Sequence, residues 1–129
     1  HWTNDLILDG SAVLSFSTQK VPLAVERTVQ FAGMQMDDIN YFVFHQANRM
    51  INDTIRKKLR LAEDRVPSTL KDFGNTSGAS LPVTISARLR DALLADKQRL
   101  LLSGFGIGLS WGTCILDVHD AVFPELLVT

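Results

Sequence analysis

Cysteine is almost absent from this sequence, in which Cys114 is the one thiol among 129 residues. A lone cysteine forms no internal disulfide, so we expect a reducing compartment. The sequence does not open with a basic segment followed by an apolar one, so we expect a cytoplasmic protein. Cys114 alternates with Leu116 and Val118 in an apolar stretch, which predicts a buried structural thiol.

Long apolar runs and a bias of charge are missing as well. No run approaches the roughly 20 residues of a membrane-spanning helix, so we expect no membrane partner. The 13 basic and 14 acidic residues nearly cancel, and neither zinc-ligand spacing nor an RNA-binding motif is present, which argues against nucleic acid and against a metal site. With 46% hydrophobic residues, the chain can bury a core.

The apolar pattern predicts an α/β fold. In order, we expect a strand at 12–17, a helix that Pro22 opens and Gly33 ends, a strand at 41–44, helices at 48–60 and 77–95, and strands at 100–103 and 109–118. Strands that alternate with helices favour a mostly parallel or mixed sheet with helices packed on it.

Polar residues directly follow the predicted strand 41–44, in the sequence His45-Gln46-Ala47-Asn48. Sites in open α/β sheets form beyond the carboxyl ends of strands, where a histidine is well placed for proton or hydrogen-bond chemistry. The alternative is a histidine that only caps a strand or a helix.

Two segments rich in small residues follow, 74–80 (GNTSGAS) and 104–112 (GFGIGLSWG). In the first, Asn75 offers amide donors near a helix N-terminus, or it simply caps that helix. In the second, glycines between two strands either expose backbone N–H groups suited to an oxyanion hole or only satisfy the geometry of a hairpin turn. A dinucleotide-binding loop is disfavoured, because a strand follows where a helix is needed.

Basic residues gather in the predicted helix 48–60. Five of the 13 lysines and arginines lie within twelve positions: Arg49, Arg56, Lys57, Lys58 and Arg60. They form either a solvated helix face or a patch for an acidic or phosphorylated partner.

Taken in order, the three motifs resemble the C-terminal half of the ketoacyl-acyl-carrier-protein synthase III family, from about Asp9 to Val118. The resemblance implies a thiolase-like half, one of two similar halves in a layered αβαβα architecture. Residues 1–129 would then be the C-terminal domain of a longer condensing enzyme whose N-terminal domain carries the nucleophilic cysteine. We therefore expect the chain to be inactive alone.

The resemblance also assigns roles. His45 and Asn75 would be the catalytic pair that acts on the malonyl thioester, and the backbone N–H of Ile107 would complete the acyl oxyanion hole. The implied substrate-binding residues are Gly10, Ser11, Leu14, Ala47, Asn48 and Phe105. The implied docking residues for the carrier are Arg49, Arg56, Lys57 and Lys58.

The partners implied by the resemblance are acyl carrier protein, acyl-CoA, the missing N-terminal half and a second copy of the full-length protein. The substrates would be CoA and phosphopantetheine thioesters, with no permanently bound cofactor. One position departs from the family pattern, since Met50 stands where an arginine is frequent. The alternative function is a non-catalytic thiolase-fold partner in a split or specialised synthase, such as a polyketide- or quinolone-forming one.

Overall fold

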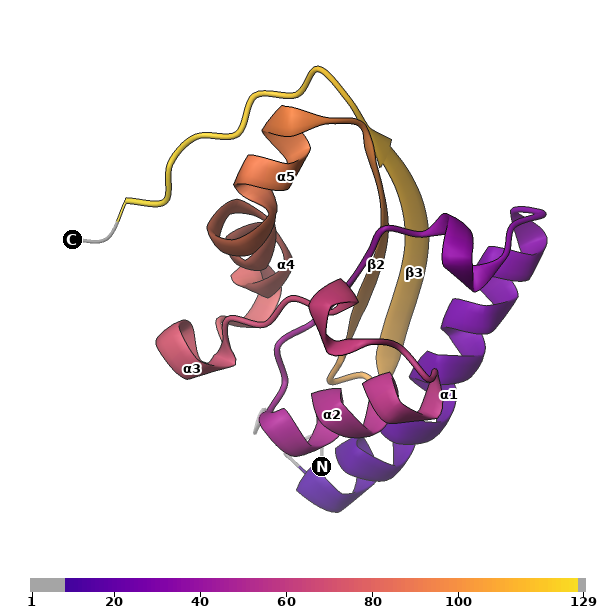
Figure 1. The fold of residues 1–129 in the computed structure, drawn as a ribbon. Coiled ribbons are helices and arrows are strands. Elements are labelled where there is room, and N and C mark those ends of the chain that lie inside the picture. Colours follow the sequence, from indigo (N-terminus) through magenta and orange to yellow (C-terminus); the bar gives the residue numbers. More distant parts are fainter. Residues whose placement is uncertain (1–8, 128–129) are drawn as a thin grey trace.

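A mixed three-stranded sheet organises residues 9–127, which the computed structural model describes (Figure 1). The strands are β1 (Tyr41–Phe44), β2 (Gln98–Gly106) and β3 (Ser110–Val118), in the order β1-β2-β3. β1 pairs with β2 in parallel, and β2 pairs with β3 in an antiparallel hairpin. The α/β class and the mixed sheet are therefore confirmed.

Helices cover both faces of this sheet. α1 (Gly10–Phe31) and α2 (Arg49–Lys58) lie on one side, and α4 (Ser80–Thr84) and α5 (Arg90–Ala95) lie on the other (Figure 1). The short helix α3 (Leu70–Phe73) precedes α4. None of the helices in residues 9–127 is long and apolar enough to cross a bilayer.

α1 overturns the prediction of a strand at 12–17. The alternating apolar residues of that segment instead belong to the first turns of a 22-residue helix. The Asp9 carboxylate caps it by accepting hydrogen bonds from the backbone N–H groups of Ser11 and Ala12, both at 3.0 Å. An N-cap of this kind satisfies donors that a helix otherwise leaves free, and it starts the helix twelve residues before Pro22.

Pro22 consequently lies inside α1 and does not open it. Proline has no N–H, so the carbonyl of Thr18, four residues earlier, loses its usual helical partner. The Lys58 ammonium donates to that carbonyl at 2.8 Å. A contact 40 residues away in sequence thus supplies the missing hydrogen bond.

The other predicted helices need smaller corrections. α2 begins one residue after the predicted start, and Asn48 instead caps it, because its side chain accepts from the Ile51 N–H at 2.9 Å. The predicted helix at 77–95 is a continuous run of different turns: a 3₁₀ turn (Ser77–Ala79), α4, a π turn (Ile85–Leu89) and α5. Two further 3₁₀ turns occupy Met36–Asp38 and Glu63–Arg65.

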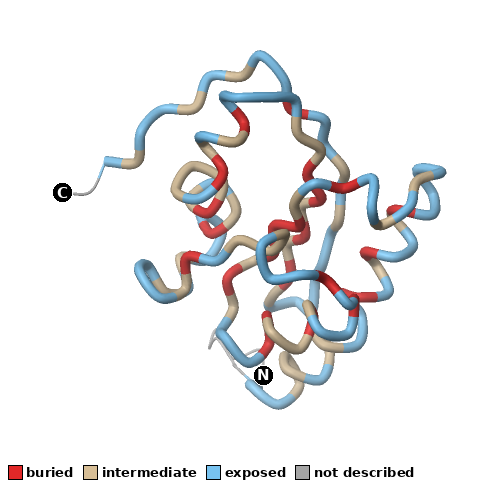
Figure 2. The backbone as a smooth tube through the Cα atoms, viewed as in Figure 1, coloured by how far each residue is buried: buried red, intermediate tan, exposed pale blue. Residues whose placement is uncertain are grey.

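Buried side chains form one cluster on each face of the sheet (Figure 2). The larger cluster joins α1 and α2 to the sheet through residues such as Val25, Phe44 and Ile55. The smaller one joins the 80–95 segment to the sheet through Leu93 and Leu100. Both clusters include side chains of β1, so this strand is packed on both faces and gives the residues that follow it a fixed starting point.

The predicted burial of Cys114 is wrong for this chain. Cys114 does share a face of β3 with Leu116 and Val118, but it is exposed, and Leu116 is 48% exposed. This face lies on the side of α4 and α5, because Val118 packs in the smaller cluster. β3 is an edge strand of the sheet, and among the described residues its Cys114 and Leu116 are left uncovered although Val118 packs against the same cluster as Leu93 of α5.

Candidate functional site

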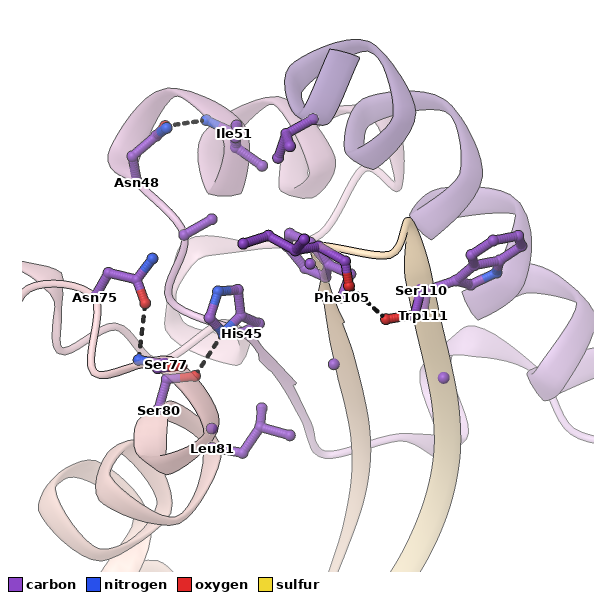
Figure 3. Close-up of a pocket in the computed structure, with 17 residues that line it drawn as sticks. His45, Asn48, Ile51, Asn75, Ser77, Ser80, Leu81, Phe105, Ser110 and Trp111 are labelled. Carbon is purple, nitrogen blue, oxygen red and sulfur yellow. Dashed lines mark hydrogen bonds between the residues drawn. The ribbon is translucent and has the colours of Figure 1, made fainter. Parts of the chain in front are cut away.

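A pocket of about 910 Å³ opens where β1 ends and the β2–β3 hairpin turns (Figure 3). Its walls come from the start of α1, the segment 45–51, the segment 75–81 and the hairpin. The lining residues are Val13, His45, Ala47, Asn48, Ile51, Asn75, Ser77, Gly78, Ser80, Leu81, Gly104, Phe105, Gly106, Ile107, Ser110, Trp111 and Gly112. All three motifs singled out in the sequence therefore meet in one place.

Among residues 9–127, His45 is the only titratable side chain in this lining. Its backbone N–H donates to the Ser103 carbonyl at 2.8 Å, which continues the β1–β2 pairing by one residue. Its carbonyl accepts from Asn52 Nδ2 at 3.0 Å, and its ring packs edge-on against Phe105 with 5.3 Å between centroids. These contacts fix the position of both the backbone and the ring of His45.

Burial lowers the pKa of His45 below its ordinary value of 6.5, and the nearby Ser77 backbone partly opposes that shift. The imidazole is therefore neutral at pH 7. A neutral imidazole carries one donor nitrogen and one acceptor nitrogen. Nδ1 lies 2.8 Å from the Ser80 hydroxyl oxygen, so Nε2 is the nitrogen left for a ligand.

Asn75 faces the same open space as His45 (Figure 3). Its Oδ1 accepts from the Ser77 backbone N–H at 2.9 Å. The amide oxygen is engaged, and Nδ2 is the end that remains free to donate. Ser77 holds a left-handed conformation, with φ of +55°, which is an unusual conformation for a residue other than glycine.

The glycine-rich segment joins β2 to β3 in a hairpin. β2 extends through Gly104 to Gly106, beyond the predicted end at residue 103, and the turn occupies residues 107–109. Ile107 lies on this turn at the pocket rim and is 53% exposed. Phe105, 7% exposed, lines the pocket as expected.

Other predicted substrate-binding residues divide into two groups. Ala47 and Asn48 line the pocket. Gly10, Ser11 and Leu14 do not, because the helix that replaces the expected strand turns Val13 toward the pocket instead.

Ser80 and Trp111 also line the pocket and were not singled out as site residues, although both belong to the small-residue segments. Trp111 packs edge-on against Phe16 of α1, with 5.0 Å between ring centroids.

The predicted docking residues lie on α2, and three of them already have partners within the chain. Lys58 donates to the Thr18 carbonyl, and Arg56 donates to the Leu61 carbonyl at 3.2 Å. Arg49 is almost fully exposed and lies 3.7 Å from the Asp53 carboxylate. Lys57 is exposed as well. Arg49 and Lys57 are therefore the most accessible cations of this group.

Gln46 holds the His45 segment in place and was not recognised in the sequence as a structural residue. Its side chain is 1% exposed. Nε2 donates to the Phe44 carbonyl at 2.9 Å, while Oε1 accepts from Ser68 Oγ at 3.0 Å and from Thr69 N–H at 2.9 Å. The amide therefore ties the end of β1 to the segment that leads into α3.

Gln46→Met should lower the free energy of unfolding by about 1–3 kcal/mol, because it leaves the buried Thr69 N–H without its acceptor. Urea unfolding followed by tryptophan fluorescence measures this change. Gln19→Met is the matched control, since Gln19 is exposed and bonds only to Ser15. Equal stabilities of the two variants would contradict a structural role for Gln46.

Burial of His45 also predicts a pH dependence of stability. Above pH 6.5 the ring is neutral in the folded and the unfolded chain. Below that value the unfolded chain binds a proton more readily, so the free energy of unfolding should decrease as the pH falls. His45→Asn should remove this part of the decrease in urea titrations between about pH 8 and pH 5. The same substitution at exposed His119 is the control and should keep the wild-type slope.

The described residues contain no group of three or more His, Cys, Asp or Glu side chains that could hold a metal ion. The described lining of the pocket offers an imidazole, carboxamides, hydroxyls and backbone N–H groups beside apolar walls.

Comparison with known proteins agrees with this geometry. Residues 29–118 match the profile of the family described as 3-oxoacyl-[acyl-carrier-protein (ACP)] synthase III C terminal. The chain belongs to this family. It is 39% identical over 115 residues to the beta-ketoacyl-[acyl-carrier-protein] synthase III of Streptococcus gordonii, which covers 88% of the chain and 36% of the relative. It is 38% identical over 114 residues to the synthase III of Staphylococcus haemolyticus.

Solved synthase structures have the same fold. A 3-oxoacyl-(acyl-carrier protein) synthase of Burkholderia xenovorans aligns with a TM-score of 0.84 and 38% identity, over 88% of this chain and 32% of that one. The priming beta-ketosynthase of the R1128 polyketide pathway aligns with a TM-score of 0.80 and 31% identity. The chain thus has one half of the thiolase-like synthase III fold, and it spans about a third of the length of the curated relatives it matches.

Proposed function

We propose that this chain is the C-terminal catalytic half of a 3-oxoacyl-acyl-carrier-protein synthase III-type acyltransferase, in fatty-acid or related biosynthesis. The observation that carries the proposal is the pairing of His45 and Asn75. The 77–80 segment engages Nδ1 of His45 and Oδ1 of Asn75. Nε2 of His45 and Nδ2 of Asn75 are left for one ligand oxygen, in a pocket lined by no other titratable side chain of residues 9–127.

Two neutral donors suit a decarboxylative Claisen condensation. When a malonyl thioester loses CO₂, the electron pair of the broken C–C bond moves into an enolate, and negative charge builds on the thioester oxygen. Donors from His45 Nε2 and Asn75 Nδ2 stabilise that charge where it develops. The enolate carbon then attacks the carbonyl of an acyl group held on a cysteine, and the cysteine leaves as a thiolate. The Ile107 N–H is assigned to the oxyanion of this second step.

The acyl-accepting cysteine belongs to a second half that this chain does not supply. Cys114, the chain's one thiol, is absent from the pocket lining. The exposed apolar face around Cys114 and Leu116 supports the proposal, because an exposed apolar surface indicates a covering partner. We therefore expect the chain alone to be inactive and the complete protein to act in the cytoplasm on CoA and phosphopantetheine thioesters. Of the proposed thioester contacts, Ala47, Asn48 and Phe105 line the pocket, and Val13 replaces Leu14.

The test is a condensation assay of the complete protein with acyl-CoA and malonyl-acyl carrier protein. We expect release of CO₂ and a 3-oxoacyl-carrier product detected by mass spectrometry, with no product from the 129-residue chain alone. Absence of product and of CO₂ across short and branched acyl-CoA substrates would contradict the proposal.

The exposed cations of α2 are proposed to dock an acidic carrier protein. Lys57→Glu in the complete protein should raise KM for the malonyl-carrier roughly threefold to tenfold and leave kcat nearly unchanged, because opposite surface charges mainly steer encounter. The effect should shrink at high salt. Lys97→Glu, at the opposite end of β2 from the pocket, makes the same charge change and should leave KM unaltered. An equal response of both variants would contradict docking on α2.

A second function is a non-catalytic thiolase-fold partner of a split or specialised synthase. The observation that favours it is the same exposed face of β3, in a chain whose pocket holds no nucleophilic thiol. Retention of full pathway activity by His45→Ala in the assembled protein would support this second function over the first.

A further inference from the structure

The 77–80 segment contacts both polar side chains of the pocket. Its first residue gives its backbone N–H to Asn75 Oδ1, and its last residue places a hydroxyl 2.8 Å from His45 Nδ1 (Figure 3). Ser77 begins a 3₁₀ turn, and Ser80 is the first residue of α4, which follows that turn directly. The orientation of both side chains therefore depends on this turn and not on β1 alone.

Ser80 is buried as deeply as a core residue, with 1% of its surface exposed. His45 Nδ1 is the one hydrogen-bond partner of its hydroxyl among residues 9–127. A buried hydroxyl that finds no other acceptor gives its proton to the available one, because an unsatisfied buried donor is costly. Nδ1 then serves as the acceptor, and the ring proton lies on Nε2.

We propose that Ser80 is a positioning residue, whose hydroxyl holds His45 in the tautomer that carries its proton on Nε2. This inference rests on the proposed function, since an Nε2–H donor is what the enolate oxygen requires. With Nδ1 engaged by Ser80 and Oδ1 of Asn75 engaged by Ser77, both free atoms, Nε2 and Nδ2, are donors. A protonated Nδ1 would instead leave a lone pair on Nε2, which repels an oxyanion.

The direct test is the ¹⁵N spectrum of histidine-labelled complete protein, with the His45 signals assigned by their loss in His45→Asn. We expect the wild-type ring to be the neutral Nε2–H tautomer. Ser80→Ala should give a mixture of tautomers and lower kcat for malonyl decarboxylation roughly tenfold to 100-fold, less than the loss expected when a direct oxyanion donor is removed. KM should change little, and Ser80→Thr, which keeps the hydroxyl, should restore both the tautomer and the rate.

Ser17→Ala is the matched control. Ser17 is also fully buried, and its hydroxyl has no partner in the described structure. The same loss of an oxygen atom there should leave the His45 tautomer and kcat unchanged. Equal loss of activity in Ser17→Ala and Ser80→Ala would show that the loss comes from altered packing, and it would overturn the proposal.

The failure of this inference and that of the proposed function are distinguishable. A wild-type ring protonated on Nδ1, or a Ser80→Ala ring still protonated on Nε2 alone, overturns the role of Ser80 even if His45 proves essential for decarboxylation. The wild-type spectrum needs no variant to fold. If Ser80 controls the tautomer but the complete protein never decarboxylates a malonyl thioester, the positioning role stands and the proposed function falls.

Discussion

His45→Ala in the complete protein should lower kcat for malonyl-thioester decarboxylation by roughly 10²–10³, the usual cost of removing one donor to a developing oxyanion. The magnitude follows from the site, where His45 is half-buried, neutral and beside Asn75 in a pocket that has no other titratable side chain among residues 9–127. Stopped assays of ¹⁴CO₂ release from labelled malonyl-carrier measure this rate.

Asn75→Ala should cause a loss of the same order. Because both donors act on one oxygen, the double variant should lose less than the product of the two single losses. His119→Ala is the control, since that histidine is exposed and follows β3 at the end remote from the pocket. A loss below tenfold for both single variants would contradict the assignment of His45 and Asn75 to the enolate oxygen.

Phe44→Ala should lower the free energy of unfolding by about 3–5 kcal/mol, the range found when a buried aromatic ring is removed from a core. Phe44 is 0% exposed and belongs to the cluster that joins α1 and α2 to the sheet. Its carbonyl also accepts from the Gln46 side chain. The cavity would therefore open directly beneath the His45 segment. Urea unfolding followed by fluorescence and by circular dichroism measures the loss.

Phe31→Ala provides a control with the same chemical change. Phe31 ends α1 and is 95% exposed, so its substitution should alter stability by less than about 0.5 kcal/mol. A fall of less than about 1.5 kcal/mol for Phe44→Ala would show that the surrounding core collapses around the lost ring. The predicted link between that core and the His45 segment would then be wrong.

Prediction from the sequence succeeded where the signal was local. β1 is a short aromatic run, and α2 has both a capping Asn48 and an apolar stripe of Ile51, Ile55 and Leu59, so each element agrees with its own residues. The glycine-rich segment 104–112 was also expected between two strands, and β2 and β3 confirm that position. The wrong predictions concern segments whose structure depends on residues distant in sequence.

The prediction for α1 is wrong for this reason. Residues 12–17 alternate like a strand, and Pro22 reads as a helix start, but Asp9 caps a helix that continues through the proline. Lys58, 40 residues later, completes the hydrogen bonding that Pro22 interrupts. The burial of Cys114 failed for a related reason, since alternation along β3 identifies a face but not whether another element covers it.

The candidate site divides in the same way. The order of the motifs predicts its chemical groups, which are an imidazole, a carboxamide and a glycine-rich segment, and it also indicates the family to which the chain belongs. The sequence does not predict which atom of each group faces the pocket. His45 Nδ1 meets a hydroxyl 35 residues away, and Gln46 meets Thr69 23 residues away. A hydrogen bond depends on the position of both partners, so only the packing of these segments against one another decides which atoms of His45 and Asn75 remain available to a ligand.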